Sequence, residues 1–185
     1  MCSSDLDMDY HAFLIKYAEI GIKGKNRHLF EEALVNQMKL ALRRCEGHFA
    51  VTRSSGRVFV DALEDYDFDE VVDALQHVFG ITGICPMVVC PVLPIEELAA
   101  EVVKFVGSEY PDRHHTFKVH TRRLDKRYPL DSMQINEELG TAILDAYPEM
   151  KVDVHKPEVF LHIELREHRV FMYSRIIRGA GGLPL

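Results

Sequence analysis

Two short segments of the chain concentrate positive charge, and clustered cations of this kind are suited to binding phosphate groups. One segment spans residues 16–27 and the other spans residues 113–127, and few acidic residues interrupt either of them. Arginine can donate two parallel hydrogen bonds to a phosphate, whereas lysine supplies a mobile point charge. We therefore predict that these segments contact the phosphate backbone of a nucleic acid. The candidate binding residues are Lys23, Lys25, Arg27, Lys118, Arg122, Arg123, Lys126 and Arg127.

The overall charge of the chain is negative, but this does not exclude a nucleic-acid partner. The sequence has 22 Lys and Arg against 29 Asp and Glu, which gives a net charge of −7. Seven of the acids lie within residues 61–73, which contain no basic residue, so the rest of the chain is balanced. Binding to phosphate depends on the local field within a screening length of about 8 Å. The simpler alternative, that each charged run is only a solvated surface, stays open at this stage.

Motifs for other kinds of chemistry are absent from the sequence. It contains no GxxxxGKS/T phosphate loop, no GxGxxG between a strand and a helix, and no HExxH zinc motif. The four cysteines, at positions 2, 45, 85 and 90, lack the spacing of metal ligands, and we expect reduced thiols. We therefore predict no catalytic residue and no metal site in this chain. For Tyr128, beside the second basic segment, stacking on a base and anchoring in the core are both open.

The first basic segment falls between the first strand and the first helix of a predicted small domain. Short apolar runs rich in strand-forming residues indicate strands, and apolar residues at a spacing of 3.6 indicate helices. We predict a strand at 11–19, a helix that Asn26 caps and Gly47 follows, a hairpin of 49–54 and 57–62, a helix at 68–79 and a strand at 81–89. The order βαββαβ is that of the ferredoxin-like fold.

The second basic segment falls in a predicted mixed α/β unit that begins after three closely spaced prolines. We expect two helices to cover a small sheet, with the basic residues on a strand and in the loop that follows it. The predicted helices are 95–106 and 132–147, and the predicted strands are 116–121, 151–154, 159–166 and 169–177. The expected divisions of the chain are a tail at 1–9, domains at 10–90 and 91–178, and a linker at 179–185.

The chain shows no sign of membrane insertion or secretion. No apolar stretch approaches the ~20 residues that a membrane span needs. Residues 1–9 have neither the basic nor the apolar part of a secretory signal. We therefore expect a cytoplasmic protein with no membrane partner.

Three strings of the sequence resemble the N-terminal half of the ThiI family, the tRNA 4-thiouridine synthetases or tRNA sulfurtransferases. They are AEIGIKGKNRHLFE at 18–31, FKVHTRRLDKRYPLDSMQINEELGTAIL at 117–144 and VFLHIELREHRVFMYSRIIRGAGGLPL at 159–185. In that family a ferredoxin-like domain carries the first string and an RNA-binding THUMP domain carries the other two. Ala18 departs from the family, which usually has Gly before this Glu; only the local turn is affected. The resemblance implies an α+β fold, a ferredoxin-like βαββαβ domain followed by a mixed α/β THUMP domain.

The resemblance also implies a function for the chain as part of a longer enzyme. It would be the tRNA-binding portion, positioning the acceptor end of tRNA for ATP-dependent thiolation of uridine 8. ATP and Mg²⁺ are expected only in an adenylating domain beyond this chain, which itself holds no cofactor. The implied partners are tRNA, a second copy in a homodimer and a sulfur-carrying cysteine desulfurase, and the family also serves thiamine biosynthesis. The alternative is a THUMP adaptor, or the RNA-binding module of a different tRNA-modifying enzyme such as a methyltransferase.

Overall fold

The computed structural model describes residues 10–18, 25–54 and 57–180, and it divides the chain into two compact units. The first unit contains residues 11–87 together with the segment that begins at Arg175. The second unit contains Tyr10 and residues 88–174. Within the described ranges, no helix is long and apolar enough to cross a membrane.

The first unit has the predicted ferredoxin-like topology. Its strands are hydrogen-bonded in the order β2-β3-β1-β4, and each of these pairs is antiparallel. This is the sheet order of a βαββαβ fold, so the prediction is confirmed. The elements are β1 (Ala12–Tyr17), α2 (Lys25–Leu42), β2 (Phe49–Ser54), β3 (Arg57–Ala62), α3 (Phe68–Gln76) and the first part of β4 (Ile81–Pro91).

Both helices of the first unit pack on the sheet through their apolar faces. Met38 from α2 and Leu75 from α3 belong to the same buried cluster as Phe13 of β1. Helix α3 begins at an N-cap, Asp67, whose carboxylate accepts a hydrogen bond from a backbone N–H of the first turn. This helix ends at Gln76, three residues before the predicted end. The chain then turns through Gly80, whose φ of +98° lies in the left-handed region that favours glycine.

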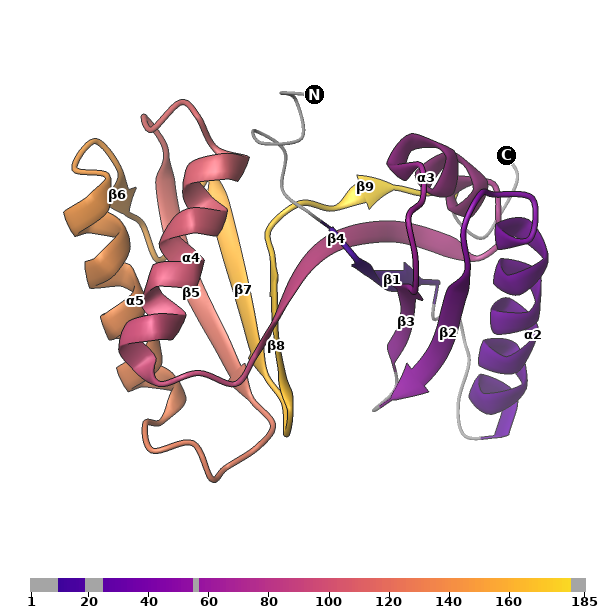
Figure 1. The fold of residues 1–185 in the computed structure, drawn as a ribbon, viewed down its shortest axis with the longest axis horizontal. Helices are drawn as coiled ribbons and strands as arrows, with labels where there is room; N and C mark the ends of the chain where they lie inside the picture. Colours follow the sequence, from indigo (N-terminus) through magenta and orange to yellow (C-terminus); the bar gives the residue numbers. More distant parts are fainter. Residues whose placement is uncertain (1–9, 19–24, 55–56, 181–185) are drawn as a thin grey trace. The chain divides into compact units, whose positions relative to one another are not determined.

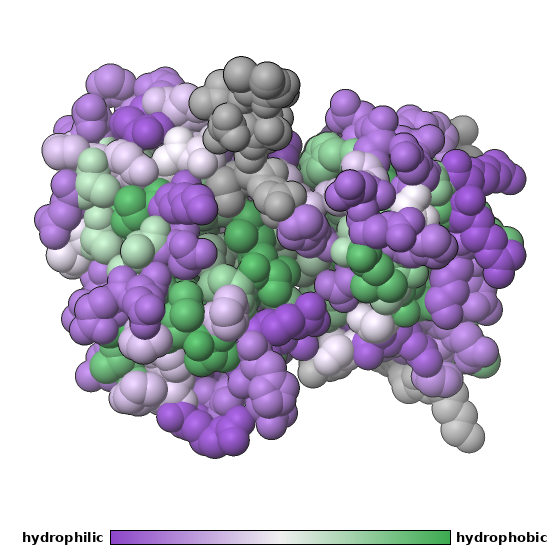
Figure 2. Space-filling view, viewed as in Figure 1, coloured by the Kyte–Doolittle hydropathy of each residue, from purple (hydrophilic) through white to green (hydrophobic). Residues whose placement is uncertain are grey.

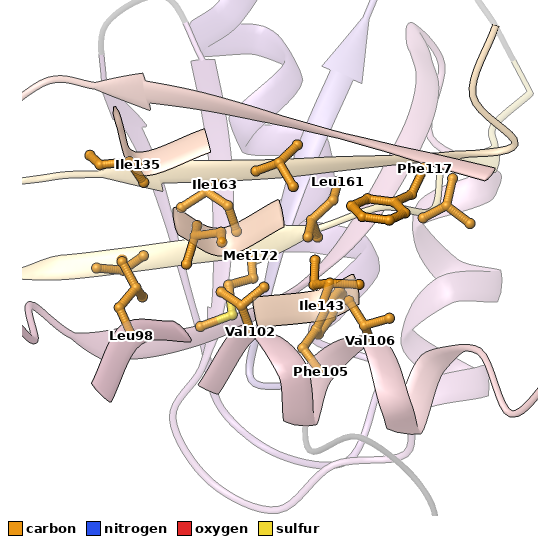
Figure 3. Packing of buried hydrophobic residues seen from close by; sticks show 14 of the residues in the cluster. Leu98, Val102, Phe105, Val106, Phe117, Ile135, Ile143, Leu161, Ile163 and Met172 are labelled. Atoms are coloured by element: carbon orange, nitrogen blue, oxygen red, sulfur yellow. The ribbon is translucent and has the colours of Figure 1, made fainter. Parts of the chain in front are cut away.

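The second unit is the predicted mixed α/β unit, with two helices on one face of a sheet (Figure 1). Strand β5 lies parallel to β6 and β7, whereas β8 is antiparallel to β7 and to the last part of β4. Side chains from both helices and three strands interdigitate in the core (Figure 3). The elements are α4 (Ile95–Glu109), β5 (Thr116–Arg123), α5 (Ser132–Ala146), β6 (Lys151–Val152), β7 (Val159–Leu165) and β8 (Arg169–Tyr173).

The end of the chain differs from the prediction. The expected strand 169–177 is two separate strands, because β8 ends at Tyr173 and β9 (Ile177–Arg178) pairs with β4 of the first unit. The backbone N–H of Gly179, which we expected to start a linker, donates to the carbonyl of Thr82. A Cβ at this position would lie 2.4 Å from the carbonyl oxygen of Ile81, so the close approach requires glycine. Residues 175–180 therefore complete the first unit.

Candidate nucleic-acid interface

Strand β5 sorts its side chains onto two faces, because successive residues of a strand point in opposite directions. Phe117 and Val119 are buried in the core beneath the helices. Lys118, His120 and Arg122 therefore lie on the opposite, helix-free face of the sheet. The Lys118 ammonium lies 5.5 Å from the centre of the Phe160 ring on the neighbouring strand, within cation–π range. Two of the predicted binding residues are thus brought to one face of the second unit.

Arg122 is exposed beside a carboxylate that already has a partner. It lies opposite Glu164 in the parallel β5–β7 pair. The Glu164 side chain is buried, and its Oε1 accepts hydrogen bonds from Arg166 Nη2 at 2.6 Å and from Arg166 Nε at 2.9 Å. Within the described residues, Arg122 takes part in no ion pair. Its charge is consequently available to an external anion.

The loop after β5 is folded back on itself by the neighbouring arginine. Arg123 Nη1 donates hydrogen bonds to the carbonyl oxygens of Lys126 and Tyr128, each at 3.1 Å. Lys126 itself is exposed, and its ammonium has no ion-pair partner in the part of the chain that the structure describes. Arg123 therefore shapes the loop, whereas the ammonium of Lys126 faces solvent.

Tyr128 is a structural anchor of this loop. Its hydroxyl donates a hydrogen bond of 2.8 Å to the carbonyl of Leu93, and its ring packs against the core of the second unit. Partial burial raises the pKa of this hydroxyl above its ordinary value. Of the two roles left open by the sequence, the contacts support anchoring.

Arg127 does not present a free cation. Its Nε and Nη2 each lie 3.0 Å from a carboxylate oxygen of Asp125, and Nη2 lies 3.5 Å from Glu167. The hydrogen bonds from Arg127 lower the pKa of Asp125. The Arg127 side chain is nevertheless 71% exposed, so it still meets solvent. Its two acidic neighbours reduce the positive potential that it can offer to a phosphate.

A hollow of about 520 Å³ lies against this loop, within the size range of small-molecule sites. Two arginines, Arg127 and Arg166, and two prolines are among the residues that line it. In Figure 2 the tip of the loop, at the lower edge of the second unit, is strongly hydrophilic. The lining residues are Val92, Leu93, Pro94, Asp125, Arg127, Tyr128, Pro129, Leu165 and Arg166.

The first basic segment is described only in part. Lys23 lies outside the described residues, and Lys25 begins α2 with a side chain that also lies outside them. Arg27, on the first turn of α2, has its Nε 3.7 Å from Glu31 and donates from Nη2 to the Tyr17 hydroxyl at 3.3 Å. The first and second units are separate bodies here, and each basic cluster is a feature of its own unit.

Sequence reasoning missed one arginine of the first unit. Arg53 on β2 has its Nη1 3.8 Å from the carboxylate of Glu31, the same acid that Arg27 approaches. The two arginines are far apart in sequence and no local pattern connects them. Only the ferredoxin-like topology, which packs α2 on β2, could have suggested that they meet.

Comparison with known proteins identifies both units. Residues 12–85 match the family model of the ThiI ferredoxin-like domain, and residues 94–175 match that of the THUMP domain. The chain belongs to the ThiI family. Its first unit is the ferredoxin-like domain of that family, and its second unit is the THUMP domain.

Three proteins of known sequence or structure resemble the chain over nearly its whole length. A probable tRNA sulfurtransferase of Lachnospira eligens is 53% identical over 176 residues, which are 95% of this chain and 45% of that protein. The crystal structure of a 4-thiouridine synthetase–RNA complex with bound ATP has a TM-score of 0.76 and 31% identity, covering 96% of this chain and 44% of the other. The crystal structure of PH1313 from Pyrococcus horikoshii has a TM-score of 0.75 and 28% identity, and the match covers 95% of this chain and 57% of PH1313. The chain thus spans less than half of the curated ThiI relative.

The described residues include no cluster suited to a metal ion. No group of three or more His, Cys, Asp and Glu side chains within residues 10–18, 25–54 and 57–180 could hold one. Burial raises the pKa of the Cys85 and Cys90 thiols to about 11, which keeps both protonated near neutral pH. These thiols are packing groups and not nucleophiles.

Proposed function

We propose that this chain is the tRNA-binding part of a tRNA 4-thiouridine synthetase. The observation that carries the proposal is the THUMP unit, which exposes Arg122 and Lys126 without ion-pair partners among the described residues. The similarity to a 4-thiouridine synthetase that was crystallised with RNA supports it. Because the matching ferredoxin-like model is that of ThiI, this proposal is favoured over a methyltransferase module.

Cations on a folded surface fit the way in which structured RNA is recognised. The major groove of duplex RNA is too narrow for side chains, so proteins read its phosphates, its 2′-hydroxyls and its shape. In this proposal Arg122 on β5 and Lys126 in the following loop contact phosphates, and Lys118, also on β5, adds a third cation. In this proposal the chain holds the acceptor end of tRNA while a domain outside it thiolates uridine 8.

The remaining components of the proposal concern the longer enzyme. ATP and Mg²⁺ act in an adenylating domain outside this chain, and a cysteine desulfurase delivers the sulfur. The enzyme is a cytoplasmic homodimer that also serves thiamine biosynthesis. The support for these components is family membership.

The experiment is a fluorescence-anisotropy titration of tRNA with the 185-residue chain at several KCl concentrations. The slope of log K against log[salt] is about 0.9 per phosphate contact for duplex nucleic acid. The double variant Arg122→Ala/Lys126→Ala should therefore bind more weakly and flatten the slope by about 1.8. A matched control, Lys151→Ala/Lys156→Ala, removes the same charge from two other exposed positions of the second unit. Equal slopes for the two double variants would refute the assignment.

A further inference from the structure

Strand β2 forms an edge of the sheet in the first unit. It is the end strand of the order β2-β3-β1-β4, and among the described residues it pairs only with β3. The N–H of Leu63 donates to the carbonyl of His48 at 2.8 Å, so these two residues form a hydrogen-bonded pair. Because hydrogen-bonded and non-hydrogen-bonded pairs alternate in an antiparallel ladder, the backbone groups of Phe49, Val51 and Arg53 are directed away from β3. This edge therefore offers backbone donors and acceptors to an added strand.

A groove lies beside this edge, and residues of both β2 and α2 line it. Helix α2 packs next to β2 (Figure 1), and the hollow that the two elements border, which we call the α2–β2 groove, has a volume of about 380 Å³. From the strand, Phe49 and Val51 line it with partly buried side chains. From the helix, Lys39 and Arg43 line it, and both are exposed. The groove therefore combines apolar surface with two cations. The full lining is Lys39, Leu42, Arg43, Gly47, His48, Phe49 and Val51.

The two cations of the α2–β2 groove lack acidic partners. Neither Lys39 nor Arg43 takes part in an ion pair within residues 10–18, 25–54 and 57–180. Of the described residues that line the groove, none is acidic. The nearby carboxylate of Glu64 is engaged by His48, whose Nδ1 lies 2.7 Å from Glu64 Oε1. A ligand that carries carboxylates would therefore meet two unpaired cations.

The spacing of the two cations matches that of alternate residues in a strand. Lys39 and Arg43 are four residues apart on a helix, which corresponds to a rise of about 6 Å. Two residues of an extended chain span about 6.8 Å, and residues i and i+2 point to the same side. We propose that the α2–β2 groove binds an extended acidic segment of a partner protein. The segment adds a strand to β2 through the outward backbone groups, and its acidic side chains at i and i+2 pair with the two cations.

Other occupants fit the groove less well. Pairing of β2 with β2 of a second copy is symmetric, so it would bring the same cations of both copies toward one another. The phosphates of RNA would meet the cations, but they would use neither the strand edge nor the apolar side chains of Phe49 and Val51. An acidic strand uses all three features. The inference thus goes beyond the proposed tRNA binding and does not depend on it.

The test is an NMR titration of the 185-residue chain with two synthetic peptides of the same composition, both acetylated and amidated at their ends. In Thr-Glu-Thr-Glu-Thr-Val-Thr both glutamates lie on one face of the extended peptide, whereas in Thr-Glu-Glu-Thr-Thr-Val-Thr they lie on opposite faces. We expect the first peptide to bind about two- to fivefold more tightly, the effect of one exposed ion pair. Binding should slow amide exchange at Phe49 and Val51 more than at Ala50 and Thr52, whose N–H groups already face β3.

Arg43→Gln removes one cation of the groove, and Arg44→Gln is its matched control. Both arginines are exposed, but only Arg43 lines the groove. Arg43→Gln should weaken binding of the first peptide about two- to fivefold, and Arg44→Gln should leave it near that of the parent.

Three results would overturn the inference: no binding of either peptide at millimolar concentration, equal affinities of the two peptides, or equal effects of the two variants. It would also be overturned if Arg43→Gln weakened the binding of tRNA and not that of the peptide, since the groove would then be an RNA site. The tRNA titration with Arg122→Ala/Lys126→Ala uses residues of the other unit, so the proposed function stands or fails separately.

Discussion

The loop after β5 should respond differently to the same substitution at two adjacent arginines, Arg122 and Arg123. Arg123 donates two hydrogen bonds to backbone carbonyls of the following loop, at Lys126 and Tyr128. Arg122 points to the other face and holds no part of the loop. Arg123→Ala should therefore loosen the loop, whereas Arg122→Ala should leave its structure intact.

The magnitude follows from the two hydrogen bonds. Each is charge-assisted, and such bonds contribute about 1.5–3 kcal/mol when buried. Because Arg123 is only half-buried, water replaces part of what is lost, and we expect a total cost of about 1–3 kcal/mol. Amide hydrogen exchange of residues 124–130, followed by mass spectrometry, measures local opening directly. The cost corresponds to exchange that is about 5- to 150-fold faster in Arg123→Ala.

Arg122→Ala provides the control, because it removes the same side chain from the preceding position. A surface substitution of this kind changes stability by about 0.5 kcal/mol or less, so exchange in the loop should stay near that of the parent. Both variants should weaken tRNA binding, but only Arg123→Ala should do so together with faster exchange. Loop exchange that is the same in the two variants would refute the assigned role of Arg123.

Two further predictions concern glycine positions and pH. Gly47→Ala should lower the urea midpoint of the first unit by the equivalent of more than about 1 kcal/mol, because φ is +107° and a Cβ would lie 2.8 Å from the carbonyl oxygen of Asp65. Gly140→Ala in α5, where a Cβ meets nothing within 4 Å, should instead raise the midpoint of the second unit. A raised midpoint for Gly47→Ala together with a lowered one for Gly140→Ala would contradict this reasoning. The pKa of Asp125 is lowered, so its ion pair with Arg127 should be fully formed above the ordinary Asp pKa of about 3.9 and should be lost as the pH falls through the lowered pKa. The Arg127 Nε–H resonance in NMR should report this loss in the parent and not in Asp125→Asn.

Local patterns in the sequence were sufficient for the order of the elements. A short apolar run rich in strand-forming residues predicted the strand now seen as β1, and a spacing of 3.6 predicted α2, α4 and α5. The ferredoxin-like order follows from these elements because few topologies accommodate βαββαβ in one sheet. Asp131 is the N-cap of α5, in a capping box with Gln134, a pattern of local side chains that the sequence contains.

Element ends and pairings between distant residues were less accessible to the sequence. The two residues of β9 are too few to show any period, and their pairing with β4 joins positions almost a hundred residues apart. The predicted end of α3 was late because the apolar residues of the following turn continue the helical spacing, although the helix stops at Gln76. Such features depend on tertiary contacts that no local window contains.

The sequence by itself determined which residues carry the positive charge, and the family strings indicated what that charge is for. Only the tertiary structure decided how each cation is used. It places Asp125 and Glu167 against Arg127, turns Arg123 into a support for its loop and leaves Arg122 exposed. It also brings Arg53 to Glu31, across 22 positions of sequence. The physical reason is that electrostatic interactions depend on distance and burial in space, and a charge count along the chain contains neither.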